Sequence, residues 1–508
     1  MSLVVPLEEV FANRTGLLAN HESWARINLG EVCSILNGFP FKSTLFNKSE
    51  GMPVIRIRDI AKGVTETFYD GDVLPEYIVR NGDLLIGMDG NFRCCEWQGR
   101  DAALNQRVCK LTPNELILHR KFLLYGLNGY LKAIEDVTSS VTVGHLSSRD
   151  IQQIPFPLPS LNEQRRIVAK VEAVLGKVDA SQQRLAKIPV LVKRFRQSVL
   201  AAACSGRLTA DWREEHTNAE ASEALLQKMQ TERPERCLAA NANRKYREPE
   251  PLAAEDLPDI PPSWLWTNFD RCCWEITVGH VGPMKDRYVE QGVRFLRSQN
   301  VRPLRFDAAG LVCIPRDFHA ALSKSRLQGG ELLVTRSGAN TGDCCVFPRD
   351  RGEANCADLV IARPLSGLCA EYGAIYVCSP TGQARLSLNE TGIAQPHFNI
   401  GAMRVKAFPL PPLAEQQEIV RRVESVFSLA DQLEARLANA KVQVDKLTPS
   451  LLARAFRGEL VPTEAELANQ MGRSYESASA LLERIRGDRA SGGDERPRKP
   501  ARRTRGAG

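Results

Sequence analysis

A chain of 508 residues is long enough to form about two to four domains with sizeable hydrophobic cores. Hydrophobic residues make up 43% and charged residues 25% of the sequence, as in ordinary soluble proteins, and no apolar run approaches the roughly 18–20 residues of a membrane span. The formal net charge is +7, but residues 486–508 alone carry eight basic and three acidic side chains. The rest of the chain is therefore nearly neutral, and its charge gives no strong indication of nucleic-acid binding.

The start of the chain, "MSLVVPLEEV", has no basic region before its short apolar stretch. We therefore expect no secretory signal and a cytoplasmic location. The sequence contains fourteen cysteines but no C-x-x-C spacing. In a long cytoplasmic chain this pattern favours reduced, mostly buried thiols over zinc ligands or disulfides.

Several sequence patterns of enzymes are missing. The chain has no G-x-x-x-x-G-K-[ST] for nucleotide phosphates, no H-E-x-x-H for zinc and no G-x-S-x-G for a serine nucleophile. It also lacks [ND]-P-P-[FYW], the pattern with which amino-methyltransferases bind a flipped base. We therefore expect no catalytic residues, no metal and no cofactor in this chain.

In chain order, the sequence predicts an alternation of two heads and two long helices. A head is a strand-like, loop-rich region that precedes a long helix. The predicted segments are an N-terminal segment (1–20), a first head (21–155), a first long helix (156–210), a charged and Pro-rich linker (211–260), a second head (261–407), a second long helix (408–460), a helical C-terminal segment (461–485) and a disordered basic tail (486–508).

The two heads share a few signals in the same order. Each has a tryptophan near its start, Trp24 in the first head and Trp264 in the second. A β-branched run follows, "PVIRIRDI" or "RFLRSQNV", and then a stretch of glycine, an acidic residue and aliphatic residues. A histidine, His145 or His397, precedes each long helix at the same distance. Elsewhere the heads diverge, which is typical of a duplicated scaffold with two different recognition surfaces.

The two long helices are copies of one another. Residues 156–208 align with residues 408–460 at a constant offset and without a gap, from "FPLPSLNEQ" and "FPLPPLAEQ" onward, and chance does not produce such agreement. Ser160 and Glu163 form an S-x-x-E capping box before an apolar run, which predicts a helix start. Pro189 is expected to interrupt the first helix with a kink.

Apolar residues recur every 3.5 residues within each copy, which is the pattern of a coiled-coil seam. The predicted seam residues are Val171, Val174, Val178, Leu185 and Val192 in the first copy and Val423, Val426, Leu433, Leu437 and Val444 in the second. The simplest partner for each seam is the other copy. The alternative is a pair of ordinary amphipathic core helices, which the length and the register disfavour.

These features together resemble the specificity subunits of type I restriction–modification enzymes. The resemblance is carried by "IPFPLPSLNEQRRIVAKVE", "FPLPPLAEQQEIVRRVE", "KRFRQSVLAAACSGRLTADW", "LLARAFRGELVPT", "QPHFN" and W-x-x-x-x-L-G-E-V at 24–32, and it covers nearly the whole chain. It implies an α+β fold in which two DNA target-recognition domains are joined by two antiparallel coiled-coil spacer helices with a pseudo-two-fold internal repeat. Each domain would recognise one half of an asymmetric bipartite site on double-stranded DNA.

The resemblance further implies that the chain has no catalysis of its own. It would bind two methyltransferase subunits and, in the full complex, two ATP-driven restriction subunits. Those partners would use S-adenosylmethionine, ATP and Mg²⁺. Two other classes stay open: a self-contained restriction–modification enzyme, which the missing motifs disfavour, and a coiled-coil scaffold or stand-alone DNA-binding protein without such partners.

Residues that contact DNA bases should be polar, capable of hydrogen bonding and close to loops. The candidates are Arg56, Arg58, Asn91, Gln106 and His145 in the first head and Arg297, Gln299, Asn300, Arg336, Asn340 and His397 in the second. The alternative for each is that it stabilises a turn or contacts a phosphate. The basic clusters of the first helix, Arg165-Arg166 and Lys193-Arg194-Arg196, are expected to be solvated rather than to bind a partner.

Overall fold

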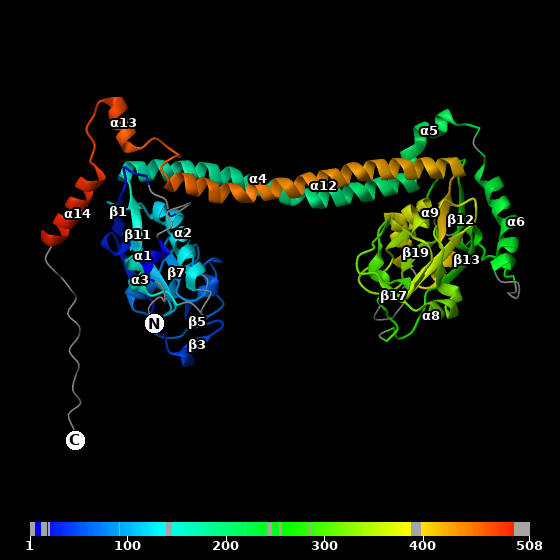
Figure 1. The fold of residues 1–508 in the computed structure, drawn as a ribbon, viewed down its shortest axis with the longest axis horizontal. Helices are drawn as coiled ribbons and strands as arrows, with labels where there is room; N and C mark the ends of the chain where they lie inside the picture. Colours follow the sequence, from blue (N-terminus) through cyan, green and yellow to red (C-terminus); the bar gives the residue numbers. More distant parts are fainter. Residues whose placement is uncertain are drawn as a thin grey trace, which may run out of the picture. The chain divides into compact units, whose positions relative to one another are not determined.

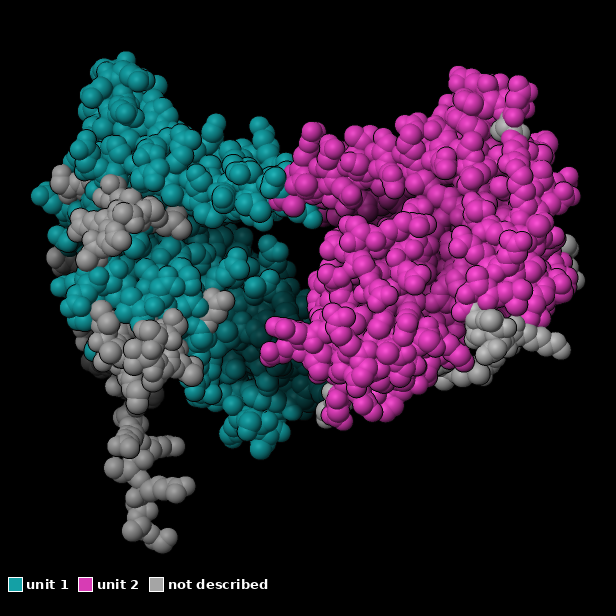
Figure 2. All heavy atoms as spheres, turned by 45° about the vertical axis from the view of Figure 1, so that its right-hand side comes forward, with its two compact units in different colours: residues 1–185, 439–508 teal, residues 186–438 magenta. Residues whose placement is uncertain are grey.

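The computed structural model describes residues 6–11, 18, 21–90, 92–138, 145–218, 220–240, 246–252, 257–284, 286–387 and 398–491. The chain divides into two compact units, unit 1 (residues 1–185 with 439–508) and unit 2 (residues 186–438), which are coloured separately in Figure 2. Two helices of 44 residues, α4 (Leu161–Cys204) and α12 (Leu413–Phe456), each contribute one part to unit 1 and one part to unit 2.

Unit 1 contains the first head. Its strands are β1 (Ala25–Asn28), β2 (Cys33–Asn37), β3 (Phe46–Asn47), β4 (Met52–Ile55), β5 (Phe68–Tyr69), β6 (Ile78–Val79), β7 (Leu84–Gly87), β8 (Cys94–Glu96), β9 (Ala102–Leu104), β10 (Val108–Pro113) and β11 (Pro155–Leu158). Its helices are α1 (Leu7–Val10), α2 (Arg120–Thr138) and α3 (Ser148–Gln152). The chain returns to this unit after the middle of α12 and adds α13 (Glu464–Met471) and α14 (Ala478–Ser491).

Unit 2 contains the second head. After the end of α4 come α5 (Ala210–Glu215) and α6 (Ser222–Ala240). The strands of this head are β12 (Leu265–Asn268), β13 (Cys273–Val278), β14 (Val293–Leu296), β15 (Val301–Arg302), β16 (Arg305–Phe306), β17 (Val312–Ile314), β18 (Arg326–Leu327), β19 (Leu332–Thr335), β20 (Cys344–Val346), β21 (Ala354–Cys356), β22 (Leu359–Pro364) and β23 (Ala407–Leu410). The helices are α7 (Phe269–Cys272), α8 (Arg316–Ala321), α9 (Ala370–Cys378), α10 (Pro380–Ser387) and α11 (Ile400–Val405).

Each head combines strands with short helices (Figure 1), and the two heads share most of their sheet topology, although β3 is added in the first head and the β15-β16 pair in the second. A four-stranded antiparallel sheet has the order β2-β10-β7-β8 in the first head and β13-β22-β19-β20 in the second. A second sheet contains one parallel pair, β4 with β9 or β14 with β21. A separate antiparallel pair, β1 with β11 or β12 with β23, joins the start of each head to the residues that lead into the long helix. The predicted α+β fold and the internal repeat are therefore confirmed.

The inner strands β7 and β19 are buried on both faces. In β7, Leu84 and Ile86 face the core that includes α2, whereas Leu85 belongs to the core on the other side of the sheet. Leu332 and Leu333 of β19 divide in the same way between two cores of unit 2. Successive side chains of a strand face opposite sides, so a strand with two buried faces needs a continuous apolar run. Polar side chains can therefore reach solvent only where these strands end.

The two long helices pack antiparallel. In unit 1, Gln182 Nε2 of α4 donates a hydrogen bond to Asp445 Oδ1 of α12 at 3.1 Å. Earlier on α4, Arg166 Nη2 donates to the carbonyl oxygen of Pro462, beyond the end of α12, at 3.3 Å. Helix α4 continues through Pro189 from Leu161 to Cys204, so the proline does not break the helix, and the expected kink stays a prediction. No helix among the described residues is apolar enough over a sufficient length to cross a membrane.

The predicted seam residues differ in burial. Val171, Val178, Val192, Val423 and Leu437 are buried, and Val174, Leu185, Val426 and Val444 are half-buried. Leu433 is wrong as a seam residue, because its side chain is 54% exposed. In unit 2 the face of α12 that meets α4 includes Phe427, over whose ring the guanidinium of Arg196 lies at 5.3 Å, and Glu434, which accepts a 3.0 Å hydrogen bond from the same arginine.

The segments that follow the long helices are folded parts of the two units. In unit 2, α6 contributes Leu225, Leu226 and Met229 to the core, so the expected linker at 211–260 packs in this stretch against the second head. In unit 1, α14 contributes Leu481 and Ile485 to the core. This helix continues to Ser491, past the predicted start of the basic tail at 486, and residues 492–508 lie outside the described part.

The cysteines are all free thiols, and nine of the fourteen are buried. Burial raises the pKa of Cys33 and that of Cys109 to about 12. These thiols are therefore protonated at neutral pH and pack as small apolar side chains.

Candidate nucleic-acid interface

The glutamate of the repeated E-Q pair joins three segments of the chain in unit 1. Glu163 is 2% exposed, and its carboxylate accepts hydrogen bonds from Trp24 Nε1 at 2.7 Å and from the backbone N of Glu464 at 3.0 Å. Trp24 begins the first head and Glu464 begins α13, so one carboxylate connects the head, α4 and the segment after α12. Burial raises the pKa of Glu163, while the two donors favour its charged form.

Glu415 repeats this arrangement in unit 2. Its carboxylate is fully buried and accepts hydrogen bonds from Trp264 Nε1 at 2.8 Å and from Thr209 Oγ1 at 2.7 Å. Arg213 forms an ion pair with the same carboxylate. Thr209 and Arg213 follow α4, so here the glutamate connects the second head, α12 and the segment after α4.

The predicted capping box at the start of α4 is half formed. The backbone N of Glu163 donates to Ser160 Oγ at 3.2 Å, as a capping box requires. The carboxylate of Glu163 does not complete the box, because it bonds Trp24 and Glu464. The second copy has Pro412 in place of the serine and keeps Glu415. The repeated glutamate is therefore explained by its contact with the tryptophan rather than by helix capping.

The glutamine of the repeated pair fixes a loop of each head to the long helix. Gln164 Oε1 accepts a hydrogen bond from the backbone N of His119 at 2.8 Å, and its Nε2 donates to the carbonyl oxygens of Ile117 and Pro159, both at 2.9 Å. Gln416 makes the equivalent bonds to the backbone of Cys369 (2.8 Å), Gly367 (3.0 Å) and Pro411 (2.9 Å). Buried amides that are satisfied in this way define one orientation of each head on its helix.

Two groups of predicted DNA-contacting residues lie in equivalent short turns after β4 and β14. The backbone N of Arg56 donates to Asp59 Oδ2 at 3.1 Å, and that of Arg297 donates to Asn300 Oδ1 at 2.9 Å. Asn300 is completely buried, and its Nδ2 bonds the carbonyl oxygens of Asp307 and Ala309 at 2.9 and 3.1 Å. The prediction that Asn300 contacts DNA is therefore wrong, because all its polar atoms stabilise this turn.

The long side chains of these turns are mostly held by the heads. Arg297 Nη2 and Gln299 Nε2 both donate to the carbonyl oxygen of Gly310, at 2.8 and 3.3 Å. The guanidinium of Arg56 lies 5.6 Å from the centre of the Phe46 ring. Arg58 differs, because its side chain is 65% exposed and lies 3.8 Å from the carboxylate of Asp59.

The end of β7 carries a polar cluster in the first head, which we call cluster 1 and define as Asp89, Arg107 and His145. Arg107 Nη1 donates to Asp89 Oδ2 at 2.8 Å, and His145 Nδ1 lies 2.6 Å from the other carboxylate oxygen, Oδ1. The side chains of Arg107 and His145 are 55% and 40% exposed. One carboxylate thus orients two partly exposed side chains.

The end of β19 carries the corresponding cluster 2, which consists of Arg336, Ser337 and Asp358. Ser337 Oγ donates to Asp358 Oδ2 at 2.6 Å, and Arg336 Nη1 donates to Asp358 Oδ1 at 3.3 Å. Asp358 has a backbone φ of +50°, which residues other than glycine rarely adopt. His145 and Arg336 were predicted as DNA-contacting residues, whereas the other members of the two clusters were not.

The remaining predicted contacts are less defined. Gln106 and Asn340 are exposed and form hydrogen bonds through their backbone atoms. Asn91 and His397 lie outside the described residues. Within the described part of the chain, no group of three or more His, Cys, Asp or Glu side chains is arranged to hold a metal ion.

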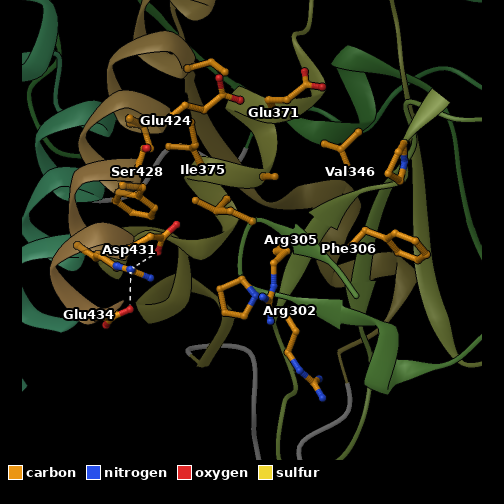
Figure 3. Close-up of a pocket in the computed structure, with 18 of the residues that line it drawn as sticks. Arg302, Arg305, Phe306, Val346, Glu371, Ile375, Glu424, Ser428, Asp431 and Glu434 are labelled. Carbon is orange, nitrogen blue, oxygen red and sulfur yellow. Dashed lines mark hydrogen bonds and ion pairs between the residues drawn. The ribbon is translucent and has the colours of Figure 1, made fainter. Parts of the chain in front are cut away.

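A cavity of about 980 Å³ lies within unit 2, between α12 and the hairpin of β15 and β16 (Figure 3). Glu424, Asp431 and Glu434 line the wall formed by α12, whereas Arg302 and Arg305 line the hairpin wall. Glu371 of α9 is a further acidic residue of this lining.

Unit 1 has a direct contact at the place that corresponds to Glu371 and Glu424 of this cavity. Lys121 of α2 forms an ion pair with Glu172 of α4, and Tyr125 Oη donates to the same carboxylate at 3.5 Å. Glu424 corresponds to Glu172 in the helix alignment. Glu371 corresponds to Lys121, since each lies two residues after the backbone N that bonds Gln416 or Gln164. The second unit therefore has a carboxylate where the first has an ammonium group.

Comparisons with known proteins agree with this architecture. The family model described as the type I restriction modification DNA specificity domain matches residues 21–190. The type I restriction enzyme EcoBI specificity subunit of Escherichia coli is 36% identical over 501 residues, which cover 97% of this chain and 98% of the relative.

Two solved structures share the fold. The crystal structure of the HsdS subunit from Thermoanaerobacter tengcongensis is 18% identical, with a TM-score of 0.51 over 88% of this chain and 100% of that chain. A chain from a study of complex assembly and conformational transition of the type I R-M system is also 18% identical, with a TM-score of 0.58 over 87% and 99%. Because a relative at 36% identity is matched over almost its full length, this chain belongs to the specificity subunits of type I restriction enzymes.

Proposed function

We propose that this chain determines the DNA sequence on which a type I restriction–modification complex acts. Each head recognises one half of an asymmetric bipartite site on double-stranded DNA. The long helices set the number of base pairs between the halves and bind the methyltransferase subunits. The observation that carries the proposal is the duplication of the head: the four-stranded sheet and the tryptophan–glutamate contact are repeated, whereas the polar residues at the strand ends differ.

A protein with two similar heads can match the symmetry of double-stranded DNA, because DNA has local two-fold axes perpendicular to its length. Two heads related by an approximate two-fold rotation can each meet one half-site in inverted orientation. Identical heads would then favour a palindromic site. Heads with different exposed side chains favour an asymmetric one, since bases are distinguished by hydrogen-bonding groups on their edges.

The chain itself carries specificity and no catalysis. Two methyltransferase subunits and, in the full complex, two restriction subunits supply the chemistry in the cytoplasm, with S-adenosylmethionine, ATP and Mg²⁺ as their cofactors. This division is supported by the missing catalytic motifs of the sequence and by the relatives, which are named specificity subunits. The nearly neutral body of the chain is compatible with partners that supply much of the contact to the DNA backbone.

The test is to map methylated sequences in DNA exposed to the chain with its cognate methyltransferase subunits. We expect methylation at one bipartite sequence, and none when either component is omitted. Methyl transfer from labelled S-adenosylmethionine by the isolated chain would instead indicate a self-contained enzyme. A complex that methylates without a defined sequence would favour the scaffold alternative.

A further inference from the structure

Clusters 1 and 2 occupy the same two backbone positions in the two heads. Strand register aligns them, because Val108 faces Gly87 in the first head and Leu359 faces Thr335 in the second. Arg107 immediately precedes Val108, and Asp358 immediately precedes Leu359. An equivalent backbone hydrogen bond confirms the match. Leu146 N donates to Met88 O at 2.8 Å in the first head, and Phe398 N donates to Arg336 O at 3.0 Å in the second.

A side-chain hydrogen bond joins these two positions in both heads, but the donor and the acceptor exchange positions between the heads. The bond is Arg107 to Asp89 at 2.8 Å in the first head and Ser337 to Asp358 at 2.6 Å in the second. Asp358 thus stands where the first head has Arg107. The first head presents a guanidinium that is 55% exposed, and the second presents a carboxylate that is 43% exposed. The apolar residues of the strands beneath are alike in the two heads.

Both presented groups are held in position and keep capacity for further hydrogen bonds. A guanidinium has five N–H donors, and the contact with Asp89 uses one of them. Each oxygen of Asp358 accepts one bond, from Ser337 or Arg336, and retains a second lone pair. The φ of +50° at Asp358 is a strained conformation for a non-glycine residue, and such strain is typical of functional positions.

We infer that this paired position specifies one base pair in each half-site, with Arg107 recognising a guanine and Asp358 recognising an exposed amino group of cytosine or adenine. Guanine offers two acceptors, O6 and N7, to an arginine in the major groove, whereas a carboxylate accepts from cytosine N4 or adenine N6. Asp89 is a positioning residue, because it acts through Arg107. This inference deepens the proposed function and rests on it.

The experiment maps methylated sequences for the full-length chain in complex with its cognate methyltransferase subunits. Arg107→Gln should lower the preference at one base pair of one half-site about tenfold to a hundredfold and leave the other half-site unchanged. Asp358→Asn should do the same at one base pair of the opposite half-site. The matched control is Arg80→Gln, an exposed arginine of the first head at the other end of β7 from cluster 1, which should change no base preference.

Asp89→Asn provides a nearly isosteric second variant. It should relax the same base pair as Arg107→Gln, because the guanidinium loses its charged anchor. The inference is overturned if Arg107→Gln and Asp358→Asn preserve all base preferences or alter the same half-site. It is also overturned if Arg107→Gln abolishes methylation while Asp89→Asn leaves every preference intact, since Arg107 would then only support the fold. An unsubstituted complex without any defined sequence would refute the proposed function itself, whatever the variants do.

Discussion

Trp24 and Glu163, 139 residues apart in the chain, are joined by a 2.7 Å hydrogen bond, and Trp264 and Glu415 are joined by an equivalent bond of 2.8 Å. Both glutamates are buried and also bind the segment that follows the other long helix. The repeated phrase of the sequence is thus a structural joint, in which a head, the start of one helix and the end of the other meet.

Glu163→Gln should destabilise unit 1 by about 1–3 kcal/mol. The amide can still accept one bond, but its NH₂ group then faces a donor, either Trp24 Nε1 or the backbone N of Glu464, and one buried donor loses its partner. Thermal unfolding of the full chain measures the effect, with Asn162→Ala at the exposed neighbouring position as the control. Equal unfolding midpoints for the two variants would show that the joint contributes no stability.

A charge at a buried seam position should separate the helices in unit 1. Val178 is 4% exposed, so Val178→Asp places an unpaired carboxylate in an apolar contact at a cost of about 3–5 kcal/mol. Lys177→Asp, one residue away on the exposed face, should cost far less. Urea unfolding of both variants distinguishes a seam from a solvated helix face, and similar losses for both would contradict the packing described.

Lys406 should make the stability of unit 2 dependent on pH. Its side chain is 5% exposed, Nζ has no hydrogen-bond partner among the described residues, and burial, with a smaller effect of Arg385, lowers its pKa from 10.5 to about 7. Between these two values the unfolded chain binds more protons than the folded chain, so the free energy of unfolding rises with pH across this window. The corresponding residue of the first head is the buried Ile154.

Lys406→Ile should therefore stabilise the chain at pH 7 and remove this contribution to the slope between about pH 7 and 10.5. Differences in unfolding free energy between variant and parent, measured at several pH values, isolate the effect from other titrating groups. A difference that is constant over the window would mean that the amine keeps its ordinary pKa.

Glu371→Lys should create in unit 2 the ion pair that unit 1 already has. The new ammonium would face Glu424, as Lys121 faces Glu172, and stabilise unit 2 by about 0.5–1 kcal/mol at low salt. Lys121→Glu should destabilise unit 1, and both changes in stability should become smaller as salt rises. Destabilisation by Glu371→Lys at low salt would refute the correspondence between these positions.

The architecture was predictable from the sequence because the duplication is explicit there. The repeat around Glu163 and Glu415 places both long helices, and the apolar run of β7 reappears in β19. The candidate contacts were less predictable, because a polar residue near a loop has the same local pattern whether it stabilises a turn or faces solvent. Asn300 is an example of the first case.

The pairing within the clusters and the burial of the seam residues depend on tertiary contacts. The pairing of Arg107 with Asp89 depends on strand register, which the local sequence does not display. Leu433 fits the heptad but is exposed, because the face of α12 that meets α4 in unit 2 includes Phe427 and Glu434. A signal for the clusters did exist, since all their residues except His145 lie within two residues of a buried apolar strand.

A chain in which both heads are the same provides the sharpest test that each head recognises its own half-site. Residues 261–407 are replaced by a second copy of residues 21–155, which retains Trp24 as the partner of the glutamate at each helix start. Methylated sequences are then mapped with the cognate methyltransferase subunits. We expect methylation at an inverted repeat of the parent half-site that the first head recognises, with a similar spacer because both long helices are unchanged. Methylation that stays at the parent's asymmetric site would contradict the claim that each head recognises its own half.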